Sequence, residues 1–300
     1  MRKKTANFFS GLWADRLAYA LVGPYMILFI VFTVLPILAS LVLSLTSFNM
    51  LEKPVFIFMD NYRRMLFEDD IFPTAIRNTL LYAAVIGPLS YLLSLLLAWF
   101  INELHALRPL VTLIFYAPSI TGSAYLIWTL FFSGDAYGYA NGLLMRFGLI
   151  NSPIIWLKNP VYMPIILIIV SLWISLGSSF LSFIAGFKGV DKSYYEAGAI
   201  DGITNRWQEL WFVTLPLMKP QMVFGAVMSI SGAFGIGALV TGLFGFPSTD
   251  YVLHTLTNHL DDYGGQRYEM GYACAIAFIL FVLMVAFNIV FRKLIGRVGK

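Results

Sequence analysis

The chain has 300 residues, of which 59% are hydrophobic and only 12% are charged, with a mean hydropathy of +0.78. A soluble domain usually carries about 25% charged residues, so water cannot be the main solvent of this chain. The net charge of +4 on so apolar a chain indicates cationic loops that face anionic lipid, and no nucleic-acid groove is expected. The single cysteine, Cys274, excludes an internal disulfide framework and a Cys-x-x-Cys zinc pair.

Six charge-free apolar stretches predict six transmembrane helices. They cover residues 17–47, 78–101, 110–133, 161–187, 221–249 and 271–291. Each reaches the roughly 20 residues that an α-helix needs to cross the hydrocarbon core of a bilayer. Prolines inside these stretches predict kinks, which membrane helices tolerate, and breaks in the spans are not required. The predicted fold is therefore an all-α integral membrane protein, with one membrane domain over residues 1–300.

Lys and Arg are concentrated in four segments, which predicts the direction of the spans. These segments are the N-terminus, the turn at residues 102–109, the loop at residues 188–220 and the tail after Phe291. Because cytoplasmic loops carry an excess of Lys and Arg, both termini are expected on the cytoplasmic side of the plasma membrane. The start Arg2-Lys3-Lys4 with the apolar run after it could form a signal peptide, but the run is too long and no cleavage site follows. We interpret it as the first helix of a multi-pass protein.

The predicted cytoplasmic loop, residues 188–220, begins with a short helix. Ser193 and Glu196 have the spacing of a capping box, so this helix is expected to begin near Tyr194. It is expected to end at Gly202, where a positive φ costs little.

A second short helix is expected to follow in the same loop. Asn205 is its predicted N-cap, and it passes Trp207, Leu210 and Trp211 before it ends at Leu215-Pro216. A capped, amphipathic hairpin of this kind can simply seal the membrane surface, with Glu196 only as a capping group. The physics of the residues leaves that alternative open.

The same loop carries a motif of a known family. Glu196-Ala197-Gly198, then Gly202 after three residues, then Val213-Thr-Leu-Pro216 resembles the EAA loop of ABC import permeases. The flanking residues, from Tyr195 to Gly202 and Arg206-Trp-Gln, are similar to the subfamily that imports maltose, other oligosaccharides and glycerol phosphate. Two departures stand out: Gly198 replaces the usual second alanine, and ten residues instead of nine separate Gly202 from Val213.

The resemblance implies a permease subunit of a binding-protein-dependent ABC importer that translocates carbohydrate, with an oligosaccharide as the expected cargo. Its implied partners are a second, homologous permease that completes a heterodimer, a dimer of cytoplasmic ATPase subunits, an extracytoplasmic sugar-binding protein and membrane lipid. ATP and magnesium would bind to the ATPase, so this chain is expected to hold no cofactor and to be no enzyme. The residues implied in coupling to the ATPase are Tyr195, Glu196, Ala197, Gly198, Asp201 and Gly202. Small side chains at positions 197 and 198 would permit close approach, and Glu196 could meet a basic residue of the ATPase.

The six stretches contain no Asp, Glu, Lys, Arg or His, which favours a neutral cargo because ion-coupled carriers commonly place such groups at midplane. Proteins usually grip sugars with aromatic faces, amides and hydroxyls, so the candidate pathway residues are Asn78, Tyr125, Trp128 and Trp173. Trp and Tyr also populate interfacial belts, so that alternative stays open. Small residues recur at every fourth place in stretch 221–249, and serines recur in stretch 161–187. Both patterns fit helix packing as well as a sugar path.

Other classes find little support in the sequence. His254 and His259 are too few to form a metal site, so they are expected on a solvated or partner-facing helix. Asp69-Asp70 and Asp261-Asp262 lack the further Asp of a metal-pyrophosphate enzyme, and no Gly-x-x-x-x-Gly-Lys-Ser/Thr phosphate loop is present. A secondary carrier for a neutral solute is the nearer alternative. It would be favoured by inverted repeats and intramembrane charge, neither of which is visible.

Overall fold

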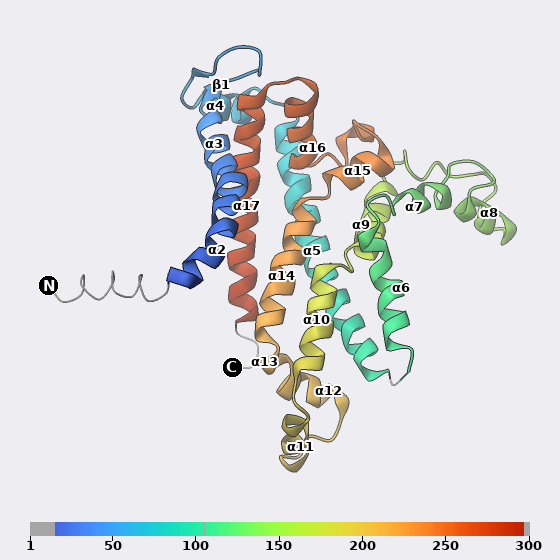
Figure 1. Cartoon of the computed structure of the whole chain (residues 1–300). Coiled ribbons are helices and arrows are strands. Elements are labelled where there is room, and N and C mark those ends of the chain that lie inside the picture. The colour runs from blue at the N-terminus through green and yellow to red at the C-terminus, as the bar shows by residue number, and fades with distance from the viewer. Residues whose placement is uncertain (1–15, 105, 297–300) are drawn as a thin grey trace, which may run out of the picture.

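The computed structural model describes residues 16–104 and 106–296, and nearly all of this part is helical (Figure 1). Its two short strands, β1 (Thr46–Ser47) and β2 (Val55–Phe56), form one antiparallel pair in which Thr46 faces Phe56. The all-α prediction is confirmed. The cations Arg2, Lys3 and Lys4, on which part of the topology prediction depends, lie outside the described residues.

Three helices of the described part are long and apolar enough to cross a bilayer by themselves. They are the run of α2 (Arg16–Phe29), the π-helical η1 (Ile30–Val34) and α3 (Leu35–Leu43), then α5 (Phe72–Glu103), and α17 (Met270–Ile295). Two further pairs of helices are long and apolar enough only if the two members of each pair are taken together. These are α9 (Met163–Ile174) with α10 (Ser178–Gly189), bent by 44°, and Arg206–Leu217 with α14 (Lys219–Phe234), bent by 85°. The structure thus offers three to five candidate spans, and the predicted six are not confirmed.

Several predicted spans are broken, although the sequence did not require breaks. The stretch 110–133 is divided between α6 (Arg108–Ile120) and α7 (Leu126–Phe131), and the stretch 221–249 between α14 and α15 (Gly237–Phe244). A proline inside a span does not by itself break it, because α2 continues through Pro24 and α5 through Pro88, although α6 ends two residues after Pro118. Two of the breaks follow small residues instead, at Ser175–Gly177 and at Gly235.

The short elements gather at the two ends of the bundle (Figure 1). At one end, which we call the hairpin end, the chain forms α11 (Lys192–Ile200), α12 (Arg206–Gln208), the π-helical η2 (Glu209–Thr214) and α13 (Leu215–Leu217). At the opposite end, the far end, lie the strand pair, α4 (Asp60–Phe67), η3 (Thr249–Tyr251), α16 (Leu256–Asp261) and η4 (Asp262–Gln266). The helix α8 (Tyr139–Arg146) projects to one side beyond α7.

Helix α5 contributes buried side chains to three apolar clusters that follow one another along the bundle. Phe72 and Ala75 belong to the far-end cluster, which also contains Leu256, Tyr263 and Tyr272. Further along α5, the middle cluster joins Tyr82, Ala83 and Ile86 to residues of α9, α14 and α15. At the hairpin end, α5 gives Leu95, Ala98 and Ile101, which pack with Phe180, Leu210 and Leu215. One unbroken helix therefore connects the two ends of the molecule.

Candidate functional site

The first helix of the hairpin, α11, is capped by Asp191. The Asp191 side chain accepts a hydrogen bond of 2.9 Å from the backbone N–H of Ser193, and this bond is the main reason that the pKa of Asp191 is lowered. The predicted capping box was therefore wrong: the helix begins at Lys192, two residues before Tyr194, and Ser193 lies inside its first turn. An N-cap needs extended backbone, which Asp191 has, with φ of −67° and ψ of 141°.

The end of α11 follows the sequence prediction. Gly202 has φ of +91°, in the left-handed region that favours glycine. The Ile203 N–H donates to the Gly198 carbonyl at 2.9 Å, and the Gly202 N–H donates to the Ala199 carbonyl at 3.3 Å. This pair of bonds is the Schellman arrangement, which satisfies two carbonyls at the helix end. Helix α11 is thus a closed unit with a cap at each end.

The second half of the hairpin starts as predicted and ends later. The Asn205 side chain accepts from the Gln208 N–H at 2.9 Å, which confirms Asn205 as an N-cap. The helical path does not end at Leu215-Pro216: it passes from the π-helical η2 directly into α13, which contains Pro216. The path ends at Met218 and then turns by 85° into α14.

Two of the predicted coupling residues hold the hairpin together from within. The Tyr195 hydroxyl lies 3.0 Å from the Thr214 hydroxyl, so it joins α11 to η2. Gly198 is buried, and a Cβ at this position would lie 3.0 Å from Ile203 Cδ1 and 3.3 Å from Val213 Cγ2. The expectation that Gly198 opens the surface for close approach by another protein was therefore wrong. Its smallness lets the two halves of the hairpin pack.

The other face of α11 is exposed. It presents the predicted residues Glu196, Ala197 and Asp201. Tyr194 and Ile200, which are 53% and 88% exposed, lie on the same face. The sequence analysis did not single out Tyr194 and Ile200 as contact residues. Their signal is helical spacing, because residues three and four apart lie on one face of a helix.

Besides the buried packing of Leu210 and Leu215 in the cluster at the hairpin end, two further contacts join the hairpin to α5. Arg206 pairs with Glu103 at 3.4 Å and with Glu209 at 2.7 Å, and the pKa of Arg206 is raised mainly by its hydrogen bond to Glu209. The Trp207 ring lies 5.5 Å from the Trp99 ring. Because the ion pair to Glu103 is largely exposed, it is worth at most about 1 kcal/mol. The buried apolar packing and the aromatic contact therefore contribute more to the attachment than the ion pair does.

A serine-lined cavity of about 270 Å³ lies between α5, the break of α9 and α10, and the break of α14 and α15. Its hydroxyl groups come from Ser90, Ser171, Ser175, Ser178, Ser179 and Ser229. The hydroxyls of Ser171 and Ser229 are buried and have no hydrogen-bond partner among the described residues. A buried polar group without a partner costs roughly 1–3 kcal/mol, so these two hydroxyls indicate a site that a polar ligand or water can fill. Broken helices within a membrane are typical of such cavities.

The predicted pathway residues do not form one group. Trp128 and Trp173 meet edge to face with ring centroids 5.6 Å apart, and the Trp128 indole N–H has no partner in the described part of the chain. Tyr125 is half-buried and lies directly over Gly242. The Asn78 amide instead donates to the Tyr251 and His254 carbonyls, at 3.1 and 3.0 Å, so it fastens the far end.

His254 and His259 are not solvated, which corrects the prediction. Their residues are only 2% and 1% exposed, and their ring nitrogens lie 3.1 Å apart. His259 bonds to Asp69, which lies 2.9 Å away although it is 190 residues distant in the sequence. No local pattern could have revealed this contact.

The helical fold and the capped hairpin define the class of protein, a multi-pass component of a membrane transport system. The chain belongs to the family described as "Binding-protein-dependent transport system inner membrane component", which it matches over residues 8–300. It is therefore a permease subunit of a binding-protein-dependent ABC importer.

Individual relatives agree with this assignment. The "Probable ABC transporter permease protein YesP" of Bacillus subtilis (strain 168) is 33% identical, over 93% of this chain and 90% of the relative. The "Arabinooligosaccharides transport system permease protein AraP" of the same organism is 29% identical, over 93% and 88%. The fold is similar to a chain in the crystal structure of a bacterial ABC transporter involved in the import of alginate. The TM-score is 0.78 at 23% identity, over 98% of this chain and 100% of that chain.

Proposed function

We propose that this permease forms half of a channel that imports a neutral carbohydrate, with an oligosaccharide as the cargo. The name of the relative AraP supports this cargo, as does the similarity of residues 195–208 to the oligosaccharide-importing subfamily. The absence of charged residues from the six apolar stretches supports a neutral solute. The serine cavity adds hydroxyl groups suited to a polyol.

The proposed assembly contains a second, homologous permease, a dimer of ATPase subunits and a sugar-binding protein on the other side of the membrane. The whole chain, residues 1–300, acts as one permease domain, and residues 188–220 form its coupling loop. The hairpin end faces the cytoplasm, and both termini are proposed to be cytoplasmic because Lys and Arg are concentrated in the terminal segments. ATP and magnesium bind to the ATPase, and this chain catalyses no covalent step.

The hairpin is the proposed contact with the ATPase. A helix that is capped at both ends moves as a unit, so closure of the ATPase around α11 would displace it without unwinding it. Glu196, Ala197 and Asp201 would touch the ATPase directly, whereas Tyr195, Gly198 and Gly202 would keep the shape of the hairpin. Displacement would reach α14 through the turn at Met218 and α5 through the Trp207–Trp99 contact.

The proposed cargo path passes the serine cavity. Its volume of about 270 Å³ lies slightly below the roughly 300–1,000 Å³ of a complete small-molecule site. That size fits one wall of a path whose other wall belongs to the second permease. Ser171 and Ser229 would bond to cargo hydroxyls, and Trp128 with Trp173 would offer aromatic faces next to the path.

The observation that carries the proposal is the exposed face of a doubly capped α11 in a chain that matches the permease family along nearly its whole length. Glu196→Lys is expected to reduce uptake per ATP hydrolysed about tenfold or more, since losing a central interface contact costs about 2 kcal/mol. Uptake of labelled oligosaccharides and ATP hydrolysis would be measured in vesicles that hold the whole complex. Glu52→Lys, an exposed charge reversal at the far end, is the matched control.

Two outcomes would contradict the proposal. Uptake at the wild-type ratio by the Glu196→Lys complex would exclude the hairpin as the coupling contact. Uptake that continues in vesicles without any ATPase subunit would exclude ATP-driven import and would support a secondary carrier.

A further inference from the structure

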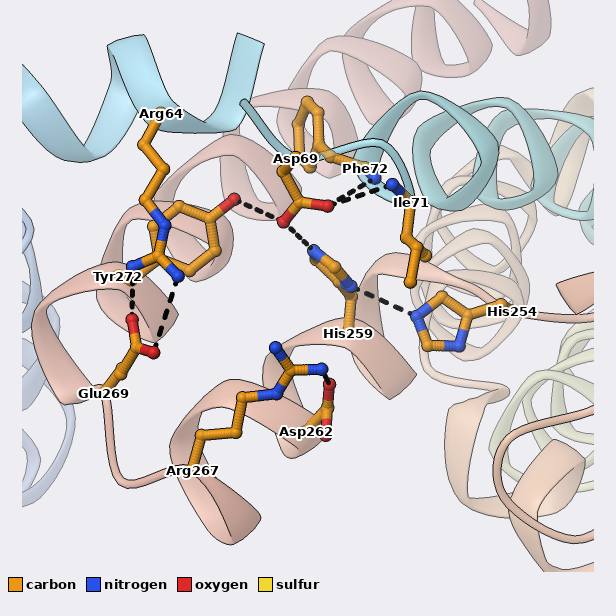
Figure 2. Close-up of polar contacts among 10 residues, drawn as sticks. All are labelled: Arg64, Asp69, Ile71, Phe72, His254, His259, Asp262, Arg267, Glu269 and Tyr272. Carbon is orange, nitrogen blue, oxygen red and sulfur yellow. Dashed lines mark hydrogen bonds and ion pairs between the residues drawn. The ribbon is translucent and has the colours of Figure 1, made fainter. Parts of the chain in front are cut away.

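A buried carboxylate joins three helix ends at the far end of the bundle (Figure 2). The Asp69 side chain, in the turn between α4 and α5, is only 4% exposed. One of its oxygens accepts from the backbone N–H groups of Ile71 and Phe72, at 3.0 Å each, where α5 begins. The other accepts from His259 of α16 at 2.9 Å and from the Tyr272 hydroxyl of α17 at 2.7 Å. This single carboxylate thus has four donors from three elements.

The two histidines extend this group into a chain. Burial alone would raise the pKa of Asp69, but the hydrogen bonds from His259 and Tyr272 outweigh it, and the pKa lies well below the ordinary value. Asp69 is therefore an anion that only accepts, so His259 donates to it from Nε2. The other ring nitrogen of His259, Nδ1, lies 3.1 Å from His254 Nε2, within hydrogen-bond distance. We call Asp69, His254, His259 and Tyr272 the clamp.

Two partly exposed charged pairs lie beside the clamp (Figure 2). Arg64 pairs with Glu269, and its guanidinium lies 4.6 Å from the centroid of the Tyr272 ring. Arg267 pairs with Asp262 at 2.6 Å and lies 4.3 Å from the centroid of the Tyr263 ring. The two guanidinium groups therefore pack against two neighbouring aromatic rings, of which Tyr272 bonds to Asp69.

Stability alone gives little reason for this arrangement. A buried charged group is often no more stabilising than packed apolar side chains of the same volume. The hydrogen bonds of a buried carboxylate do, however, depend on the positions of its donors, whereas helices that touch only through apolar side chains can shift along one another. The clamp therefore fixes how the ends of α5, α16 and α17 are oriented relative to one another.

Helix α5 links the clamp to the hairpin. It runs unbroken for 32 residues, while the paths through α9 and α10 and through α14 and α15 are interrupted. Its other end carries Trp99 and Glu103, which contact Trp207 and Arg206 of the hairpin. A displacement of the hairpin can thus travel along α5 without being absorbed at a break.

We propose that Asp69, His259 and Tyr272 are positioning residues that join α5, α16 and α17 into one body, which follows the hairpin during the transport cycle. This inference depends on the proposed function, because it needs a hairpin that an ATPase moves. The inference adds a function for the far end of the molecule, opposite to the proposed contact with the ATPase.

The test measures distances between spin labels in the complete transporter, in nanodiscs, without nucleotide and with ATP plus vanadate. Cysteines at Glu68 and Gln266, in a Cys274→Ser background, place one label pair across the clamp. A second pair, Gln266 with Arg146 of α8, measures the clamped body against an element outside it. In the wild type the first distance should be the same in both states, while the second should shift.

The variants separate positioning from general stability. His259→Phe keeps a ring but removes the donor to Asp69, and it should broaden the Glu68–Gln266 distances and reduce uptake per ATP hydrolysed about tenfold. Tyr272→Phe removes one hydroxyl with almost no change in volume and should reduce the same ratio less. His259→Gln, whose amide can donate to Asp69, should restore most of the coupling. Asp70→Asn and Tyr268→Phe, at exposed neighbouring positions, should behave as wild type.

The outcomes distinguish this inference from the proposed function. If the wild-type Gln266–Arg146 distance responds to ATP while His259→Phe and Tyr272→Phe keep Glu68–Gln266 distances as narrow and transport as well coupled as wild type, the positioning role is refuted. A wild-type Glu68–Gln266 distance that changes with ATP would refute it as well. If no wild-type distance responds to ATP, the proposed ATP-driven function fails, and the inference fails with it. Tyr272→Phe keeps the test decisive if His259→Phe does not assemble.

Discussion

Gly202 allows a quantitative prediction about the hairpin. Its φ of +91° lies in the region where a residue with a Cβ costs roughly 1–2 kcal/mol more than glycine. A Cβ at Gly202 would meet nothing within 4 Å, so packing adds nothing and the whole cost is backbone strain. Gly202→Ala is therefore expected to increase the population of the opened hairpin about 5- to 30-fold.

Hydrogen exchange at the Ile203 amide measures this opening directly. That amide donates to the Gly198 carbonyl across the end of α11, so it exchanges when the end opens. Gly202→Ala should accelerate its exchange by the same factor, and Gly202→Asn by less, because Asn tolerates left-handed backbone better. Gly189→Ala is the matched control, since a Cβ there also meets nothing within 4 Å and its φ is not positive.

Two results would refute this reasoning. Equal exchange at Ile203 in Gly202→Ala and Gly189→Ala would show that the left-handed turn does not limit hairpin opening. A larger effect of Gly202→Asn than of Gly202→Ala would show that side-chain size, and not backbone conformation, sets the cost.

Two further predictions concern buried polar groups outside the hairpin. The fully buried Asn141 amide binds Ser133, Asp135, Ile154 and Trp156, so Asn141→Leu should cost about 1–3 kcal/mol for each group left unpaired. A melting temperature equal to that of Asn151→Leu, at an exposed position, would contradict this. Burial is the main reason that the pKa of His254 is lowered from 6.5 to about 4, and His259 and Arg267 lower it further. Asp262 and Asp69 act in the opposite direction but do not outweigh these effects. The unfolded chain therefore binds the proton first, and stability should fall by up to about 3 kcal/mol as the pH drops from 6.5 to 4. His254→Gln should reduce the dependence of the melting temperature on pH between 6.5 and 4. An unchanged dependence would refute the attribution of this loss of stability to His254.

Local signals in the sequence predicted the ends of α11 and α12 in part. Asn205 and Gly202 were identified correctly, because capping depends on residues within one turn of the helix end. Asp191 and Ser193 are both good N-cap residues two positions apart, so propensity could not choose between them. The structure selects Asp191 because the chain that leaves α10 is already extended there.

Helix breaks and buried contacts were not predictable in the same way. The interruptions at Ser175–Gly177 and Gly235 border the serine cavity, and hydropathy averaged over a span is insensitive to them. The role of Gly198 depends on Ile203 and Val213, which approach it only when the hairpin closes. Similarly, Asn78 resembles a pathway residue until the carbonyls of Tyr251 and His254 are placed beside it.

By itself, the sequence determined that this protein is a helical membrane protein and that its loop at residues 188–220 resembles that of import permeases. Hydropathy and short motifs depend only on residues that are neighbours in the sequence, so both can be recognised without a structure. Tertiary structure alone decided that Asp69 meets His259 and Tyr272, since it lies 190 and 203 residues from them in the sequence. A buried anion is stable only where several donors converge, and only the folded bundle brings those donors together.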